Sequence, residues 1–187
     1  MTSIDPIDAS SVATLHAAFR VARADFEDAV RAAAGRWEDK ILEPEVGGGE
    51  PWPPHMAAAH ALLGERWRFR HIEEILAQPP DAATVSAEAF ASTPAGQQEL
   101  EQRRARYAAL DGAEATIAAA ATEWPEIDAT YARLEDRDLT RPAGLFEGQL
   151  GYLESQGQPP SDDIRGCLIL AVVHLTDHAQ QLRQAVS

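Results

Sequence analysis

Three histidines have the residue type and spacing to bind a metal ion. His174 and His178 stand four residues apart in an apolar stretch near the end of the sequence. Four residues advance an α-helix by about 6 Å and turn it by about 40°, so both imidazoles project from one helical face. Neutral imidazole is the commonest metal ligand among side chains. A third imidazole from another helix, here His60, would complete three protein ligands and leave one coordination position open, as in catalytic metal sites.

Spacing alone leaves two interpretations of these histidines open. A lone histidine on an apolar helical face is usually a hydrogen-bonded core residue, and this is our interpretation of His16 and His71. Two imidazoles on one face of a core helix need two sets of hydrogen-bond partners. His174 and His178 are therefore either a buried polar pair or two metal ligands.

Other familiar metal and catalytic motifs are missing from the sequence. None of the 6 histidines follows a glutamate by three residues, which excludes the Glu-x-x-His pairs of di-iron bundles. Leu175 stands where an HExxH protease needs a glutamate after His174. Cys167 is the single cysteine, which excludes an internal disulfide and a zinc finger and predicts a cytoplasmic setting. We interpret Cys167 as a small apolar core residue rather than a nucleophile.

The composition predicts one all-α domain over residues 1–187. The chain is long enough for a sizeable core, and 45% of its residues are hydrophobic. Alanine is abundant and β-branched and aromatic residues are few, which favours helices. A formal net charge of −14 argues against nucleic acid and anionic membranes as partners. No apolar run reaches the roughly 20 residues that span a bilayer, and the first residues do not read as a signal peptide.

Helical periodicity and capping residues locate the elements that must position the histidines. We expect an up-down-type four-helix bundle with short additional helices. Asp8 or Ser10 should cap the first helix, Ser161 to Asp163 should cap the last, and Trp124-Pro125 should kink or break the fourth. The expected helices cover residues 10–41, 54–76, 93–110, 113–134, 145–153 and 161–185.

Three further residues are candidates for the surroundings of a metal. Trp67 and His71 share an apolar stripe with His60 on the second expected helix, and we expect them to line a pocket. Gln181 follows His178 by one helical turn. Metal-bound histidines usually donate their other ring N–H to a partner, so Gln181 should orient a ligand histidine or line the pocket.

The arginines of the second expected helix allow two interpretations. Arg66, Arg68 and Arg70 alternate along this helix near several glutamates. We favour solvated helix faces on which these arginines pair with residues such as Glu65 and Glu73. The alternative is that Arg66 or Arg70 reaches the pocket mouth and binds a substrate carboxylate.

Taken together, these motifs resemble the DinB-like (DinB/YfiT) metalloprotein superfamily. Trp52 precedes His60 by eight residues, as a tryptophan does in that family. His174, His178 and Gln181 match its His-x-x-x-His pattern with a following glutamine. The stretch 134–142, LEDRDLTRP, is similar to a Leu-x-Asp-x-Asp-Leu-x-Arg-Pro-like segment of the family. The resemblance covers roughly residues 12–186.

The resemblance implies a four-helix bundle that binds a divalent metal through His60, His174 and His178. Zinc, nickel or iron would be the ion, and the family includes transferases and isomerases that use a low-molecular-weight thiol such as mycothiol on a small-molecule substrate. A homodimer is a further implication. In the maleylpyruvate isomerase subgroup the first ligand of the last helix is typically glutamate, and His174 departs from that pattern.

Two other functions stay open at this level. Metal-bound water in the open position would support hydrolysis instead of thiol chemistry. A protein without turnover could hold a metal or small ligand between its helices and act in a stress response.

Overall fold

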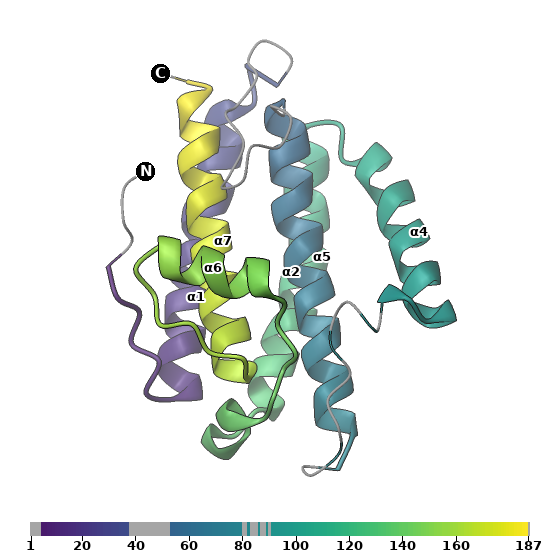
Figure 1. Ribbon diagram of the computed structural model, residues 1–187. Helices are drawn as coiled ribbons and strands as arrows, with labels where there is room; N and C mark the ends of the chain where they lie inside the picture. The colour runs from purple at the N-terminus through teal and green to yellow at the C-terminus, as the bar shows by residue number, and fades with distance from the viewer. Residues whose placement is uncertain are drawn as a thin grey trace.

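Four long helices pack side by side and form the body of the molecule (Figure 1). They are α1 (Val12–Ala33), α2 (Pro54–Ala77), α5 (Ala113–Arg133) and α7 (Ile164–Gln184). Both α5 and α7 pack against α1 and against α2, so α1 and α2 face each other across the bundle. The computed structural model describes residues 5–37, 53–79, 82, 86, 89 and 91–186. The prediction of an all-α bundle is confirmed.

The helix directions refine the up-down order that the sequence predicts. Arg66 of α2 pairs with Glu123 of α5, and Glu73 pairs with Thr130 seven residues further along both helices, so α2 and α5 run parallel. A strict up-down bundle would alternate direction here. The alternation is interrupted because an additional helix, α4 (Pro94–Ala109), carries the chain back along the outside of α2 (Figure 1).

Two short helices connect α5 to α7. They are the 3-10 helix η1 (Asp136–Thr140) and α6 (Glu147–Ser155), which lies across α7 (Figure 1). The helix predicted over residues 145–153 corresponds to α6, two residues later in the chain. The first helix was expected to reach residue 41, but α1 ends at Ala33. The last part of that expected helix and Trp52 lie outside the described residues.

Local capping explains where the long helices begin. Ser11 caps α1 by accepting a hydrogen bond from the Thr14 N–H at 3.1 Å, so the expectation of Asp8 or Ser10 is wrong. Asp163 caps α7 through the Gly166 N–H, as predicted. A Cβ atom at Gly166 would collide with the carbonyl oxygen of Ser161, so glycine is needed at this tight entry. The α5 helix continues through Pro125 without a break.

The segment 134–142 fastens the ends of two helices. The Asp136 carboxylate accepts a hydrogen bond from the Val12 N–H at 2.8 Å, at the start of α1. Arg141 donates to the carbonyl oxygens of Ile75 and Gln78 at the end of α2, at 2.5 and 2.9 Å. The Ile75 carbonyl also accepts from the Gln78 N–H at 3.3 Å, so the arginine adds to the hydrogen bonding at this C-terminus. The segment therefore has a structural role in the described contacts.

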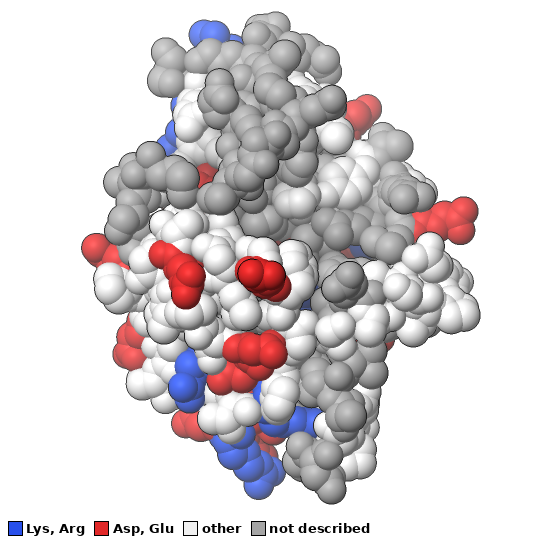
Figure 2. Space-filling view, in the orientation of Figure 1, with Lys and Arg blue, Asp and Glu red and all other residues white. Residues whose placement is uncertain are grey.

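Buried aromatic side chains fill the bundle between these ends. Phe19 of α1 lies with its ring centroid 5.5–5.9 Å from those of Phe69, Trp124 and Tyr131. Such tilted and edge-on contacts suit the charge distribution of aromatic rings. Among the described residues, no helix combines the length and apolar character needed to cross a membrane. On the face shown in Figure 2, acidic side chains lie over α6 and α7, and basic ones gather toward the lower end.

Candidate metal centre

His60 from α2 and His174 and His178 from α7 meet between the two helices. One ligand atom from each ring lies within 4.8 Å of the others. The ring centroids are 5.1 Å apart for His60 and His174, 5.2 Å for His60 and His178, and 4.5 Å for the α7 pair. His178 is fully buried and His174 is 6% exposed, while His60 is half-buried. The three histidines lie close enough to hold a metal ion.

The geometry of the α7 pair matches two ligands of one metal. The Nε2 atoms of His174 and His178 are 3.2 Å apart. Two imidazole nitrogens bound at 2.0–2.1 Å in a tetrahedral arrangement would be about 3.3–3.4 Å apart. The spacing of four residues and the buried apolar run of α7 on both sides place the two rings on one inward face. A zinc-sized ion would therefore fit without repacking the helix.

Each of the three rings has a hydrogen-bond partner at Nδ1. His174 is hydrogen-bonded to Glu65 at 2.6 Å, His178 to Gln181 at 3.0 Å, and His60 to Tyr107 at 3.1 Å. These contacts fix the orientation of each ring and commit its Nδ1 atom. Such partners are typical of metal-binding histidines. The oxygens of Glu65 and Gln181 only accept, so they select the tautomer that presents Nε2, and the Tyr107 hydroxyl does the same for His60 when it accepts from Nδ1–H.

The partners of the α7 pair also determine where the protons lie. A carboxylate and an amide oxygen accept hydrogen bonds, so His174 and His178 donate from Nδ1 to Glu65 and Gln181. Each neutral ring then has a lone pair on Nε2. Two lone pairs 3.2 Å apart repel each other unless a cation or a proton lies between them. The hydrogen bonds thus orient the two Nε2 lone pairs so that they can bind a cation.

Glu65 connects the histidines to a buried arginine. Its side chain is fully buried, and Arg68 donates to it from Nε at 3.0 Å. Burial alone would raise the pKa of Glu65, but the charge of Arg68 and the hydrogen bond from His174 outweigh it and lower this pKa. Glu65 is therefore a carboxylate that acts as an acceptor for His174.

Two of the arginine interpretations are corrected by the structure. Arg68 is not on a solvated face, because its side chain is only 10% exposed beside the buried Glu65. Arg66 is also buried, with its Nε atom 3.2 Å from Glu123 of α5. The parallel packing of α2 and α5 covers this face, which the sequence of α2 alone does not reveal. Arg70 is exposed, as expected.

The other sequence candidates lie away from the three rings or are buried. Trp67 and His71 follow His60 by about 10 and 16 Å along the α2 axis, and their role in lining a pocket stays a prediction. His16 pairs with Asp128 on the opposite side of the bundle. Cys167 is fully buried, and burial raises the pKa of its thiol to about 12. It is a core residue, as predicted.

Sequence reasoning missed Glu65 and Tyr107 as partners of the histidines. Glu65 follows His60 by five residues, which puts it off the His60 stripe. Its spacing of three residues from Arg68 is the same as in an exposed ion pair, so it carries no separate signal. Tyr107 belongs to α4, and nothing in the sequence shows that this helix lies against α2.

No family model, curated protein sequence or solved structure matches the chain. The resemblance to the DinB-like superfamily stays a prediction that depends on its motif residues.

Proposed function

We propose that this protein is an enzyme that binds a divalent metal through the Nε2 atoms of His60, His174 and His178. The observation that carries the proposal is that three imidazoles converge while neighbours engage all three Nδ1 atoms. Histidines with a purely structural role in the core would need hydrogen-bond partners, but their rings would have no reason to converge on one point. Three protein ligands leave room for a substrate or cofactor atom, which is the pattern of catalytic sites.

The donor set favours zinc, nickel or iron(II). Neutral imidazoles suit these borderline ions, whereas magnesium and calcium prefer oxygen ligands. A divalent ion held here would lower the pKa of a thiol or a water in its open position. His60 is the half-buried member of the group, so access to the centre is expected on its side.

The nearby residues support chemistry that uses an added thiol. Glu65 is committed to His174 and Arg68 through its two oxygens, which leaves it unsuited to act as a base. Tyr152 donates its hydroxyl to Asp177 at 3.0 Å. The buried Cys167 thiol, with its pKa of about 12, cannot supply the nucleophile. We therefore propose transfer or isomerisation with a low-molecular-weight thiol of the mycothiol type acting on an electrophilic small molecule.

Metal analysis and a thiol-conjugation assay test this function. The purified protein should hold about one zinc, nickel or iron ion per chain. Turnover of a generic electrophile should require both the metal and an added thiol. The His60→Ala variant should lose this turnover, while Cys167→Ala, the matched control, should retain it.

The remaining outcomes separate the alternatives. Turnover with metal but without any thiol would replace thiol chemistry by hydrolysis. A full metal site that is inactive with a broad panel of thiols and electrophiles would favour a non-catalytic binding protein. A chain that takes up no metal would overturn the proposal.

A further inference from the structure

Two adjacent side chains in the described part of α4 reach the bundle. This helix stands at the edge of the molecule and packs mainly against α2 (Figure 1). Among the α4 residues whose burial the structure describes, Gly96 is buried, Arg106 and Tyr107 are partly buried, and the others are exposed. These two residues therefore link α4 to the bundle among the described side chains.

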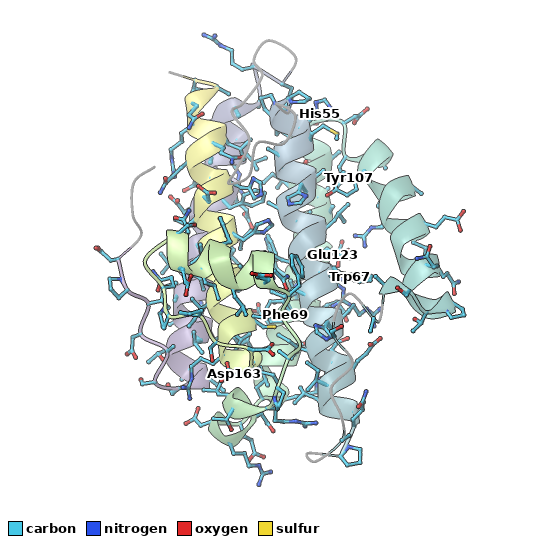
Figure 3. All side chains as sticks on the ribbon, in the orientation of Figure 1. His55, Trp67, Phe69, Tyr107, Glu123 and Asp163 are labelled. Carbon is cyan, nitrogen blue, oxygen red and sulfur yellow. The ribbon has the colours of Figure 1, made fainter. Side chains whose placement is uncertain are left out.

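The two residues contact different helices of the bundle. The Tyr107 hydroxyl is hydrogen-bonded to Nδ1 of His60 on α2, at 3.1 Å. The Arg106 guanidinium forms an ion pair with Glu123 on α5. Glu123 is nearly buried and also pairs with Arg66 of α2. Figure 3 labels Tyr107 and Glu123, which lie along the side of the bundle that faces α4.

His60 is the ligand that receives a hydrogen-bond partner from α4. His174 and His178 belong to one helix, are buried and are oriented by Glu65 and Gln181 of α2 and α7. His60 is half-buried and comes from α2, and its Nδ1 atom is hydrogen-bonded to Tyr107 of the peripheral α4. The contact with Tyr107 thus couples the orientation of this ring to the docking of α4.

We infer that Tyr107 is a positioning residue for His60, and that docking of α4 and metal binding stabilise each other. This inference rests on the proposed metal site. Docked α4 holds the His60 ring with Nε2 available to the metal, which raises metal affinity. Because coupling between two equilibria is reciprocal, bound metal must stabilise docked α4 by the same factor. Arg106 contributes through its ion pair with Glu123.

Metal affinity gives the first test. We compare Tyr107→Phe and Arg106→Gln with two matched controls, Tyr152→Phe and Arg133→Gln, which remove a hydroxyl and a guanidinium that do not belong to α4. Affinity is measured by competition with a chelator. Tyr107→Phe should bind zinc about 10–100-fold more weakly, as is usual for loss of a ligand's hydrogen-bond partner. Arg106→Gln should weaken binding less, and the controls should match the wild type.

Two further readouts separate positioning from general stability. The visible absorption spectrum of the cobalt(II)-substituted protein should change in Tyr107→Phe and not in Tyr152→Phe, because it reports ligand geometry. Hydrogen exchange of residues 94–109 should accelerate when a chelator removes metal from the wild type, whereas that of α5 should change less. In Tyr107→Phe this metal dependence should disappear.

The outcomes distinguish the inference from the proposed function. A wild-type protein that binds no metal would overturn both the proposed metal site and this inference. A wild type that binds metal, with Tyr107→Phe equal to it in affinity and cobalt spectrum, would overturn the inference and leave the metal site intact. Exchange of α4 that ignores metal would do the same. If circular dichroism shows that Tyr107→Phe is unfolded, Arg106→Gln decides by the same measurements.

Discussion

Two helix–helix interfaces on opposite sides of the bundle, here called seams, contain the same residue types in different roles. Between α1 and α5, His16 is paired with Asp128 at 2.7 Å, and Arg23 donates to the same carboxylate at 2.8 Å. Between α2 and α7, His174 is paired with Glu65, which in turn accepts from Arg68. Each seam thus has a histidine, a carboxylate and an arginine.

The two seams differ in burial and in what the second ring nitrogen faces. The His16 side chain is 30% exposed, and its ring stacks on Tyr131 at 4.3 Å. Its Nε2 atom is already used by Asp128. His174 uses Nδ1 for its carboxylate and directs Nε2 toward His178. A histidine–carboxylate–arginine group by itself therefore only links two helices, and we call such a group a clamp. It becomes a candidate metal site when further imidazoles converge on the histidine nitrogen that the carboxylate does not use.

The largest expected effect is the loss of metal when a ligand is removed. His174→Ala should lower the metal content from about one ion per chain to almost none, because two imidazoles hold a divalent ion far less tightly than three. The helical content should persist, since the apolar helix faces are buried without the ion. Elemental analysis and circular dichroism measure both. His16→Ala is the control and should keep its metal. Complete unfolding on chelation would show that the site is structural.

Removing the carboxylate should have the next largest effect, and only on one seam. Glu65→Gln should weaken metal binding about 10–100-fold, since His174 loses its anionic partner. It should also destabilise the metal-free protein by about 3–5 kcal/mol, because Arg68 becomes an unpaired buried charge. Asp128→Asn should leave metal affinity unchanged and cost less than about 1 kcal/mol.

Chelator competition and urea unfolding distinguish these variants. The double variant Glu65→Gln with Arg68→Met should recover stability but not metal affinity. If Glu65→Gln and Asp128→Asn changed metal affinity equally, the proposed difference between the two seams in metal binding would be wrong.

The stability that the α1–α5 seam contributes should decrease at acidic pH. Burial would raise the pKa of Asp128, but hydrogen bonds from His16 and Arg23 outweigh it and lower this pKa below its ordinary 3.8. A lowered pKa adds stability above the unfolded value, and this stability is lost as the pH falls through the folded value. Urea unfolding at several pH values below 4 should therefore show a shallower loss in Asp128→Asn than in the wild type. Identical pH profiles would mean that the clamp contributes nothing.

The smallest expected effect belongs to His16 itself. His16→Gln can still donate to Asp128 but loses the stacking contact with Tyr131. We expect a loss of less than about 1 kcal/mol in the free energy of unfolding, as for other exposed pairs. Metal content should not change. A loss of metal in this variant would contradict the assignment of His16 to a purely structural seam.

Local sequence signals predicted the features that depend on neighbouring residues. Helical periodicity located the long helices, and Asp163 caps α7 as expected. The four-residue spacing of His174 and His178 placed both rings on one face. These features follow from the geometry of a single helix, which a sequence encodes directly.

Features that depend on which helices become neighbours were not predictable. Glu65 and Arg66 look like surface residues until α7 and α5 cover them. Tyr107 acquires its contact with His60 only because α4 returns along α2. The cap at Ser11 depends on Thr14, which completes a reciprocal pair of hydrogen bonds that Asp8 and Ser10 do not form with the helix.

The division of the histidines between α2 and α7 also has a consequence for biosynthesis. His60 leaves the ribosome about 120 residues before His178, a delay of roughly 6–24 s at usual rates of elongation. Until α7 is made, Arg68, Glu65 and His60 of α2 lack the helix that packs over them. A nascent chain therefore cannot assemble the three-histidine centre, and metal should be acquired only after the last helix has docked.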